Sequence, residues 1–156
     1  MKRWIHRILG GGVVLGLSHV SMTGLAQAES QLNLNSQLTI QVEQLNSQQG
    51  NVCYRIFNGS QGFPSGDGNA VAQGCDPITD LDMSLTIEAL PAGTYAMAIY
   101  HDANGDEVLN RGLFGMPTEG YGFSNNAIAR TGPASYDEAM FLLGGNMTLQ
   151  IRMQYP

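Results

Sequence analysis

The chain has 156 residues, of which 43% are hydrophobic and 13% charged, so it can form one domain behind an export segment. Seven basic residues stand against thirteen acidic ones, and three of the basic residues lie within the first seven positions. Loss of the N-terminus would leave four arginines against thirteen acidic residues, a net charge of −9, with no lysine. Binding to nucleic acid or to an anionic membrane surface needs clustered Lys and Arg, so this balance excludes both as partners.

The N-terminal segment has the three parts of a secretory signal peptide. Residues 1–7 are basic, residues 8–17 are apolar and rich in glycine, and residues 26–28 read Ala-Gln-Ala, a small-x-small cleavage sequence. These features predict a signal peptide over residues 1–28, cleaved after Ala28. The apolar run is about half of the ~20 residues that span a bilayer. We therefore expect an exported protein, periplasmic or extracellular, with no integral membrane segment after cleavage.

Short segments of alternating polarity, separated by turn sequences, recur along the rest of the chain. After a flexible lead-in over residues 29–36, they predict a single β-sandwich domain over residues 37–156. Residues 94–100 are apolar on both faces, which is typical of a strand buried on both sides. The predicted fold is all-β, an antiparallel β-sandwich of about seven strands, Ig-like, with long loops. Six strands are placed at residues 37–45, 52–57, 83–89, 94–100, 139–143 and 146–155.

Turn sequences predict how some of these strands connect. Residues 90–93 read Leu-Pro-Ala-Gly and are expected to join the strands on either side as a hairpin. The glycine pair at residues 144–145 is expected to form a second, two-residue hairpin link. Residues 58–80 should form a long loop with at most one short edge strand. Ser135 and Glu138 have the spacing of a capping box, with room for one helical turn.

Two cysteines, Cys53 and Cys75, remain beyond the predicted signal peptide. In an oxidising compartment such a pair is more often bridged than free, so we predict a disulfide; two buried thiols are the alternative. Cys53 falls on a predicted strand and Cys75 in the polar loop, so the bridge would pin that loop to the sheet. Closing a loop of about twenty residues is worth on the order of 3 kcal/mol in the chain-entropy treatment.

Residues 101–126 hold the densest polar chemistry of the chain, and they begin where the 94–100 strand ends. Asp102, Asn104 and Asp106 take the first, third and fifth places of this loop, and Asn110 takes the ninth. This is the spacing of oxygen ligands in the front half of a calcium loop. These four residues are therefore candidate Ca²⁺ ligands.

The back half of the loop departs from the calcium pattern. Glu107 stands where a glycine is usual, and Leu113 stands where a glutamate normally closes the site. A metal here would have to borrow ligands, with Glu107, Glu119 and Asp137 as candidates. The alternative is a polar turn whose Asp and Asn side chains bond the backbone.

Residues 114–126 contain three glycines and one proline and have neither a strand nor a helix period, so they predict a long irregular loop. Such loops in compact domains tend to be functional. The aromatic residues Phe114, Tyr121 and Phe123 are expected to fold the loop onto the sheet as an extra core layer, and ligand binding through Tyr121 and Asn125 is the alternative. The candidate binding residues of the region are His101, Glu119, Tyr121, Phe123 and Asn125.

Several motifs resemble one bacterial family. His101 and Asp102 begin the motif His-Asp-x-Asn-Gly, and residues 114–126 follow as Phe-Gly-x-Pro-x-Glu-Gly-Tyr-Gly-Phe-Ser-Asn-Asn. The remaining motifs are Gly-Pro-x-Ser-Tyr-x-x-Ala at 132–139, Arg-Ile-Phe-Asn at 55–58 and Gly-Phe-Pro at 62–64. Together they resemble the domain-of-unknown-function family numbered 2141, found in exported bacterial proteins. The resemblance implies a small β-sandwich similar to transthyretin-like and carboxypeptidase-regulatory-like domains, and it implies no established activity.

The inventory of catalytic residues is poor. His101 is the only histidine beyond the predicted signal peptide, so a His-rich zinc site cannot form. No nucleophile motif such as GxSxG surrounds Ser124 or Ser135. We therefore predict a non-catalytic exported domain without a cofactor, which binds an envelope or extracellular partner or acts structurally. Two alternatives stay open: weak Ca²⁺ binding through residues 102–110, and a hydrolase or isomerase with its site around His101 and Asp102.

Overall fold

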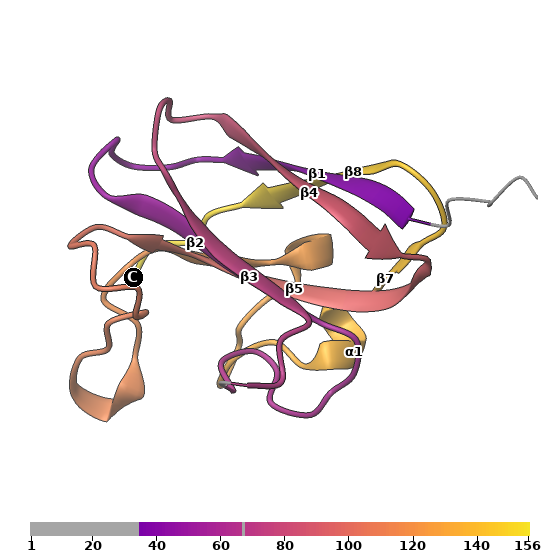
Figure 1. Cartoon of the computed structure of the whole chain (residues 1–156). Helices are drawn as coiled ribbons and strands as arrows, with labels where there is room; N and C mark the ends of the chain where they lie inside the picture. Colours follow the sequence, from indigo (N-terminus) through magenta and orange to yellow (C-terminus); the bar gives the residue numbers. More distant parts are fainter. Residues whose placement is uncertain (1–34, 67) are drawn as a thin grey trace, which may run out of the picture. The chain divides into compact units, whose positions relative to one another are not determined.

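A computed structural model describes residues 35–66 and 68–156 of the chain. The predicted signal peptide, the cleavage after Ala28 and the lead-in up to residue 34 lie outside these described residues. The described chain forms two β-sheets stacked as layers (Figure 1). The strands are β1 (Asn35–Glu43), β2 (Asn51–Phe57), β3 (Ala72–Pro77), β4 (Met83–Pro91), β5 (Gly93–Asp102), β6 (Tyr121–Phe123), β7 (Phe141–Leu143) and β8 (Met147–Arg152).

The helical elements of the described residues are three short turns, η1 (Leu113–Gly115), η2 (Ser124–Asn126) and α1 (Tyr136–Ala139). The predicted capping box of α1 is present, since the Ser135 hydroxyl and the Glu138 carboxylate each bond the other residue's backbone N–H. None of these turns, nor any other helix within the described residues, has the length and hydropathy to cross a membrane.

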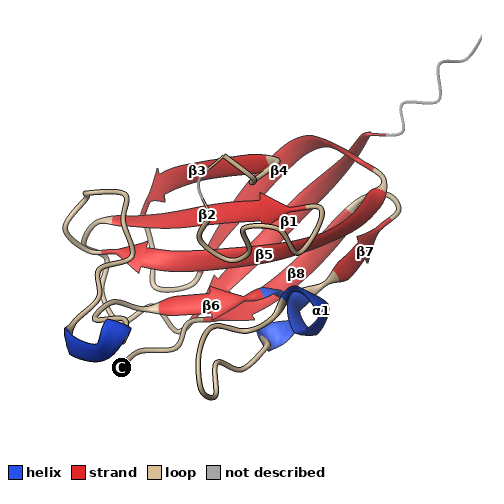
Figure 2. Ribbon diagram, turned by 90° about the horizontal axis from the view of Figure 1, so that it is seen from below, coloured by secondary structure: helices blue, strands red, loops and turns tan. Residues whose placement is uncertain are grey.

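The two sheets differ in pairing. Sheet A has the order β4-β1-β8, and sheet B has the order β3-β2-β5-β6, with β7 also paired to β5 (Figure 2). In sheet A, β1 runs antiparallel to β4 but parallel to β8. The prediction of an all-β sandwich is confirmed, and the parallel β1–β8 pair is a feature that hydrophobic alternation does not reveal. The first strand begins at Asn35, inside the segment predicted as a lead-in.

The main core lies between the sheets and is built by alternation along the strands. Leu38, Ile40 and Val42 of β1 are each at most 1% exposed. They are joined by the inward positions of β4 and β8, including Leu85 and Ile151. The period of two that predicted these strands therefore also selects their buried faces, because successive side chains of a strand point to opposite sides.

A second layer covers the other face of sheet B. Strand β5 sends Met97 and Ile99 into the main core, while Ala96 on its opposite face belongs to a separate buried cluster. That cluster contains Phe123, Ala127, Ala134 and Ala139, with Phe63 and Tyr136 packed against it. The prediction that this strand is buried on both faces is thus confirmed, and the cover comes from residues 124–139 and the loop around Phe63.

Both hairpins predicted from turn sequences are wrong. Strand β4 belongs to sheet A and β5 to sheet B, so Ala92 between them carries the chain from one sheet to the other. Likewise β7 pairs with β5 whereas β8 pairs with β1, so residues 144–146 also cross between the layers. A tight turn sequence fixes where the chain reverses, but the pairing partner is decided by the apolar faces that must meet.

Two short strands complete sheet B. Strand β3 is the edge strand expected within residues 58–80, and it carries Cys75, which we predicted to lie in a loop. Strand β6 falls inside the segment predicted to be irregular, where it pairs Tyr121 with Tyr100. The predicted disulfide is present, and Cys53 and Cys75 are directly paired in the register of β2 and β3.

The disulfide should stabilise the fold measurably. It closes a loop with a sequence separation of 22 residues, so reduction should lower the free energy of unfolding by about 3 kcal/mol. Urea unfolding followed by far-UV circular dichroism, with and without dithiothreitol, measures this difference in the free energy of unfolding. A Cys53→Ala/Cys75→Ala variant should match the reduced protein and should not respond to dithiothreitol. Equal stability of both redox forms would contradict the expectation.

Candidate functional site

Asp102, at the end of β5, organises the loop that follows it. Its side chain is fully buried. Carboxylate atom Oδ1 accepts the backbone N–H groups of Gly105 and Asp106 at 2.8 and 3.1 Å, and Oδ2 accepts that of Glu107 at 3.0 Å. Three backbone donors converge on this one carboxylate, and charge-assisted hydrogen bonds of this kind hold residues 103–107 in a turn.

Glu119 holds the next part of the chain in the same way. Its Oε1 accepts the N–H of Ala103 at 3.1 Å, and its Oε2 accepts the N–H of Asn110 at 2.9 Å. Residues 110–118 then form a two-legged projection, called the arm below. Backbone bonds between Thr118 and Asn110 and between Gly112 and Met116 join its legs. Glu119 therefore anchors the arm, a role that its candidacy as a ligand did not anticipate.

The remaining candidate calcium ligands meet at the tip of the 102–110 loop. Asn104 Nδ2 donates to Asp106 Oδ2 at 2.9 Å and to Asn110 Oδ1 at 3.1 Å, and Asn110 Nδ2 donates to Asp106 Oδ2 at 3.1 Å. These amide bonds lower the pKa of Asp106, the bond from Asn104 contributing most. The four predicted ligands thus do come together, but each carboxylate accepts N–H groups of the loop itself.

Asp137 is far from this loop. Asp137 lies on α1, and the neighbouring Tyr136 hydroxyl donates to the Thr94 carbonyl near the start of β5. Asp102 lies at the other end of the same strand. The eight residues between these ends span roughly 26 Å in an extended strand. Among the described residues, no group of three or more His, Cys, Asp or Glu side chains is arranged to hold a metal ion.

His101 is a buried joint between three segments. Its Nε2 lies 2.8 Å from the Gln49 carbonyl oxygen, and its Nδ1 lies 2.8 Å from the Tyr155 hydroxyl. A carbonyl can only accept, so Nε2 carries the proton and donates, and Nδ1 accepts from Tyr155 in the neutral imidazole. The Tyr155 oxygen in turn accepts the N–H of Asn46 at 3.1 Å. Burial raises the pKa of Tyr155, which keeps this hydroxyl protonated.

The two serines considered as nucleophiles are engaged elsewhere. Ser124 is fully buried; its hydroxyl donates to the Ala139 carbonyl and accepts the N–H of Met97 at 2.9 Å. Ser135 caps α1 through Glu138, and bonds from Ser135 lower the pKa of that carboxylate. Neither hydroxyl bonds to His101, whose ring nitrogens contact Gln49 and Tyr155 instead.

A groove of about 390 Å³ lies on the outer face of sheet B, where the second layer stops. Its floor follows the strand register: Arg55 pairs with Ala98, and Ala98 pairs with Phe123. Tyr100 and Tyr121 form the next facing pair. Directly opposed residues on neighbouring strands share one face of a sheet. These five side chains therefore form one continuous surface, and the volume lies within the range of small-molecule sites.

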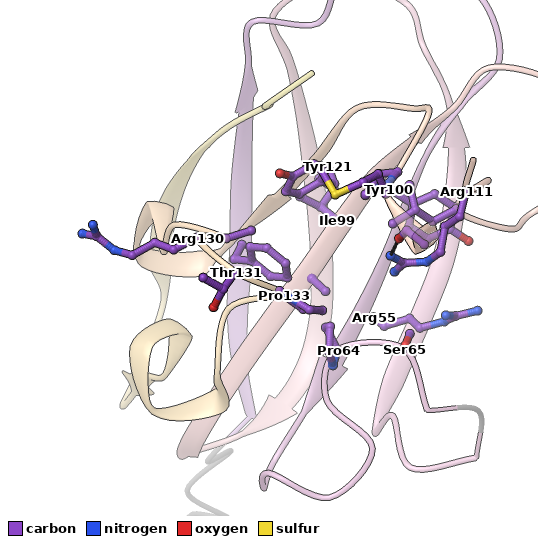
Figure 3. A pocket seen from close by; sticks show the side chains of 18 of the residues that line it. Arg55, Pro64, Ser65, Ile99, Tyr100, Arg111, Tyr121, Arg130, Thr131 and Pro133 are labelled. Carbon is purple, nitrogen blue, oxygen red and sulfur yellow. Dashed lines mark hydrogen bonds between the residues drawn. The ribbon is translucent and has the colours of Figure 1, made fainter. Parts of the chain in front are cut away.

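The walls of the groove come from three loops (Figure 3). Residues 129–133 of the second layer form one wall, and Pro64 and Ser65 add to it. The arm forms the facing wall through Arg111 and residues 114–117. The bond from Asn110 to Glu119 anchors the base of the arm and so helps to position this wall.

Three of the four arginines in the described residues line this groove, namely Arg55, Arg111 and Arg130. Arg55 and Arg111 lie at the same end, near Tyr100, while the guanidinium of Arg130 points outward at the other end (Figure 3). The fourth, Arg152, is paired with Glu43 on sheet A at 3.3 Å. None of the described Asp and Glu residues lines the groove, so the cations of an acidic chain are concentrated on one face.

Tyr100 links the groove floor to the loop. Its ring lies under the guanidinium of Arg55, and the distance between the ring centroid and the guanidinium carbon is 5.9 Å. Its hydroxyl donates to the Glu107 carbonyl at 2.5 Å. Burial raises the pKa of Tyr100, and the charge of Arg55 acts in the opposite direction. The hydroxyl thus stays neutral, and the largely buried ring lies beneath Arg55 on the floor of the groove.

The aromatic residues of the 114–126 segment divide between two roles. Phe123 is 5% exposed in the second layer and Tyr121 is half-buried, as an extra core layer requires. Phe114 is fully exposed at the tip of the arm, beside Leu113, so its assignment to that layer is wrong. The arm is held up by its own backbone bonds and by Glu119, which prevents Phe114 from reaching the sheet. Asn125 donates to the Met140 carbonyl at 2.6 Å and lies outside the groove.

The arginines and Tyr100 were missed by sequence reasoning, although a usable pattern was there. The chain beyond the predicted signal peptide has only four basic residues, and all are Arg. Arg55 alternates on β2 with the buried Ile56, which would have placed it on the outer face of the sheet. What the sequence could not reveal is that the arm and residues 129–133 meet over that same face.

A family model described as "Uncharacterized protein conserved in bacteria (DUF2141)" matches residues 40–151. The match covers more than half of the chain, so the chain belongs to this family, as its motifs indicated. It spans every strand at least in part, together with the loop, the arm and the groove. Comparisons with curated proteins and with solved structures found no match.

Replacing the buried carboxylate should test its structural role. Asp102→Asn leaves one acceptor oxygen and turns an amide N–H₂ toward backbone donors, so it should lower the free energy of unfolding by about 2–4 kcal/mol. Urea unfolding measures the change. The matched control is Asp106→Asn, which alters the same loop at an exposed position and should cost clearly less. Equal effects of the two substitutions would contradict the role given to Asp102.

Proposed function

We propose that this chain is an exported, non-catalytic domain that binds a small organic ligand in the groove between the arm and residues 129–133. The observation that carries the proposal is the incomplete second layer over sheet B. It leaves the side chains of Ala98, Tyr100 and Tyr121 lining a concave surface between the arm and residues 129–133. Ligand sites are typically concave, mostly apolar and supplied with a few placed polar groups.

Export is supported by two features. The N-terminal sequence has the order of a signal peptide, and the Cys53–Cys75 disulfide is of the kind that persists in oxidising compartments. A binding role without catalysis is supported by the surroundings of His101, Ser124 and Ser135, whose polar atoms are used in structural hydrogen bonds. A hydrolase with a serine nucleophile activated by His101 would need that serine within hydrogen-bond reach of the histidine.

We further propose that the 102–110 loop is built by hydrogen bonds and needs no metal. The oxygens of Asp102 and Asp106 accept the N–H groups of Gly105, Asp106, Glu107 and Val108, so these backbone groups have partners without a cation. This favours the polar-turn alternative over the calcium alternative.

Thermal melting in calcium and in chelator tests this proposal. A site of the weak extracellular kind, with Kd ~1 mM, would add about 1.4 kcal/mol of stability at ~10 mM Ca²⁺ and raise Tm by roughly 5 °C. We expect no rise beyond that given by NaCl of equal ionic strength. A calcium-specific rise that Asp106→Asn abolishes would overturn the proposal and restore the calcium site.

The binding proposal can be tested with N-phenyl-1-naphthylamine, a neutral aromatic probe whose fluorescence increases in apolar surroundings. The wild-type protein should bind it saturably with one site per chain. Ala98→Phe places a ring on the floor of the groove and should weaken binding at least about tenfold, equivalent to ~1.4 kcal/mol. Leu142→Phe is the control, because Leu142 is exposed on β7 and does not line the groove. Absence of wild-type binding, or unchanged binding by Ala98→Phe, would refute the groove as the site.

A further inference from the structure

We infer that the groove recognises an organic anion, namely a carboxylate or another single-charged acidic group attached to an apolar body. This inference rests on the proposed function and adds the chemical class of the ligand. Two observations carry it: the position of Arg55 and Arg111 at one end of the groove, and the apolar character of the surface that continues from them.

The anionic end of the ligand belongs beside Arg55 and Arg111. Arg111 Nη1 donates to the Gly115 carbonyl at 2.9 Å, which fixes the side chain against the arm. A guanidinium has five N–H donors in a planar fork, so this one bond leaves the fork able to receive a carboxylate. Arg55 is held over the ring of Tyr100. Arginine is the side chain best suited to planar, two-point recognition of carboxylate.

Charge distribution favours an anion here in spite of the acidic chain. The described residues include eleven acidic side chains and four arginines, yet three of the arginines and none of those acids line the groove. Fields in a concave site depend on the nearest charges more than on net charge, since distant surface charges are screened within about 8 Å at physiological salt. Three of the four arginines of the described residues thus line one groove of a domain whose other described charged side chains are mostly acidic.

The apolar end of the ligand belongs toward the centre of the groove. Next to Arg55 in the strand register lie Ala98 and then Phe123, and Met116 and Pro133 also line the groove. The small side chain of Ala98 leaves depth there, and Tyr121 offers a ring for stacking. A freely soluble ion such as acetate would leave this surface wet, so the geometry selects an amphipathic molecule over a small inorganic or acetate-like anion.

The test compares two probes that share an aromatic body and differ in charge: 8-anilinonaphthalene-1-sulfonate, an anion, and N-phenyl-1-naphthylamine, which is neutral. The anion should bind about tenfold more tightly at low salt, and only its affinity should fall as NaCl is added. Arg111→Gln and Arg55→Gln should each remove most of that advantage while leaving the neutral probe unchanged. Arg152→Gln is the matched control, because Arg152 lies on sheet A in an ion pair with Glu43 and away from the groove.

The outcomes distinguish a failure of anion recognition from a failure of the proposed binding function. If neither probe bound, the proposed function would fail. If both bound equally, or if the arginine variants kept the full affinity for the anion, the groove would remain a site but anion recognition would be refuted. Loss of both probes in Arg111→Gln would mean that Arg111 only shapes the arm, which also overturns the inference.

A final experiment distinguishes a free ligand from a lipid headgroup. Decanoate should displace the anionic probe, and decanol should do so much less well, because the two share an apolar chain and differ in the carboxylate. Sedimentation with phosphatidylglycerol vesicles should not exceed that with phosphatidylcholine vesicles. Strong sedimentation with the anionic vesicles, together with no displacement by decanoate, would contradict a free amphipathic anion as the ligand.

Discussion

The structure depends on one constraint: strand β5 is apolar on both faces and must therefore be covered twice. Sheet A supplies the first cover, over Met97 and Ile99. The second cover must come from loops, since within the described residues the two sheets consist of these strands alone and do not close on themselves. Residues 124–139 and the loop around Phe63 provide it over Ala96. They leave Ala98 only partly buried, and the groove is the part of the outer face that they leave open.

The opposite wall of the groove follows from a different interaction. The buried carboxylate of Asp102 and the half-buried carboxylate of Glu119 accept backbone N–H groups on both sides of the loop, and the arm begins at Asn110, which Glu119 holds. Local hydrogen bonding of this kind determines a loop conformation without a hydrophobic core beneath it. The residues that suggested a calcium site are therefore part of the scaffold that positions Arg111.

Hydrogen bonds of the buried His101 side chain connect the segments next to the 102–110 loop. His101, Tyr155 and Gln49 tie the end of β5 to the C-terminal segment and to the turn before β2. Gly120 lies against this joint, where a Cβ atom would come within 2.5 Å of the Tyr155 ring. Both ring nitrogens of His101 thus lie within hydrogen-bond distance of these two partners.

Much of the fold could be predicted from the sequence, and the limits have physical causes. Alternation of polar and apolar residues predicted β1, β4 and β8 and their inward-facing side chains. The 94–100 segment, which is apolar on both faces, indicated that sheet B is covered on both sides. Pairing between strands could not be predicted from turn residues, because β4–β5 and β7–β8 are joined by sharp turns that cross between sheets. Short strands such as β6 carry too few residues for a period.

The site was less accessible than the fold. Side-chain type pointed to Asp102 and Glu119, but their function as acceptors of backbone N–H groups requires the loop conformation. The groove brings together β2, β5, β6, the arm and residues 129–133, which are separated by up to about eighty positions in the chain. No local sequence pattern predicts that these distant segments come together. The one compositional clue was that arginines are the only Lys or Arg residues beyond the predicted signal peptide.

The central claim is that the uncovered end of the outer face of sheet B binds an amphipathic anion. It is tested most directly by titrating ¹⁵N-labelled protein with decanoate and following the backbone amide shifts by NMR. The account predicts saturable shifts concentrated at Arg55, Ala98, Tyr100, Arg111 and Tyr121. Shifts concentrated on sheet A, around Gln41 and Glu43, or no saturable shifts at all, would contradict it.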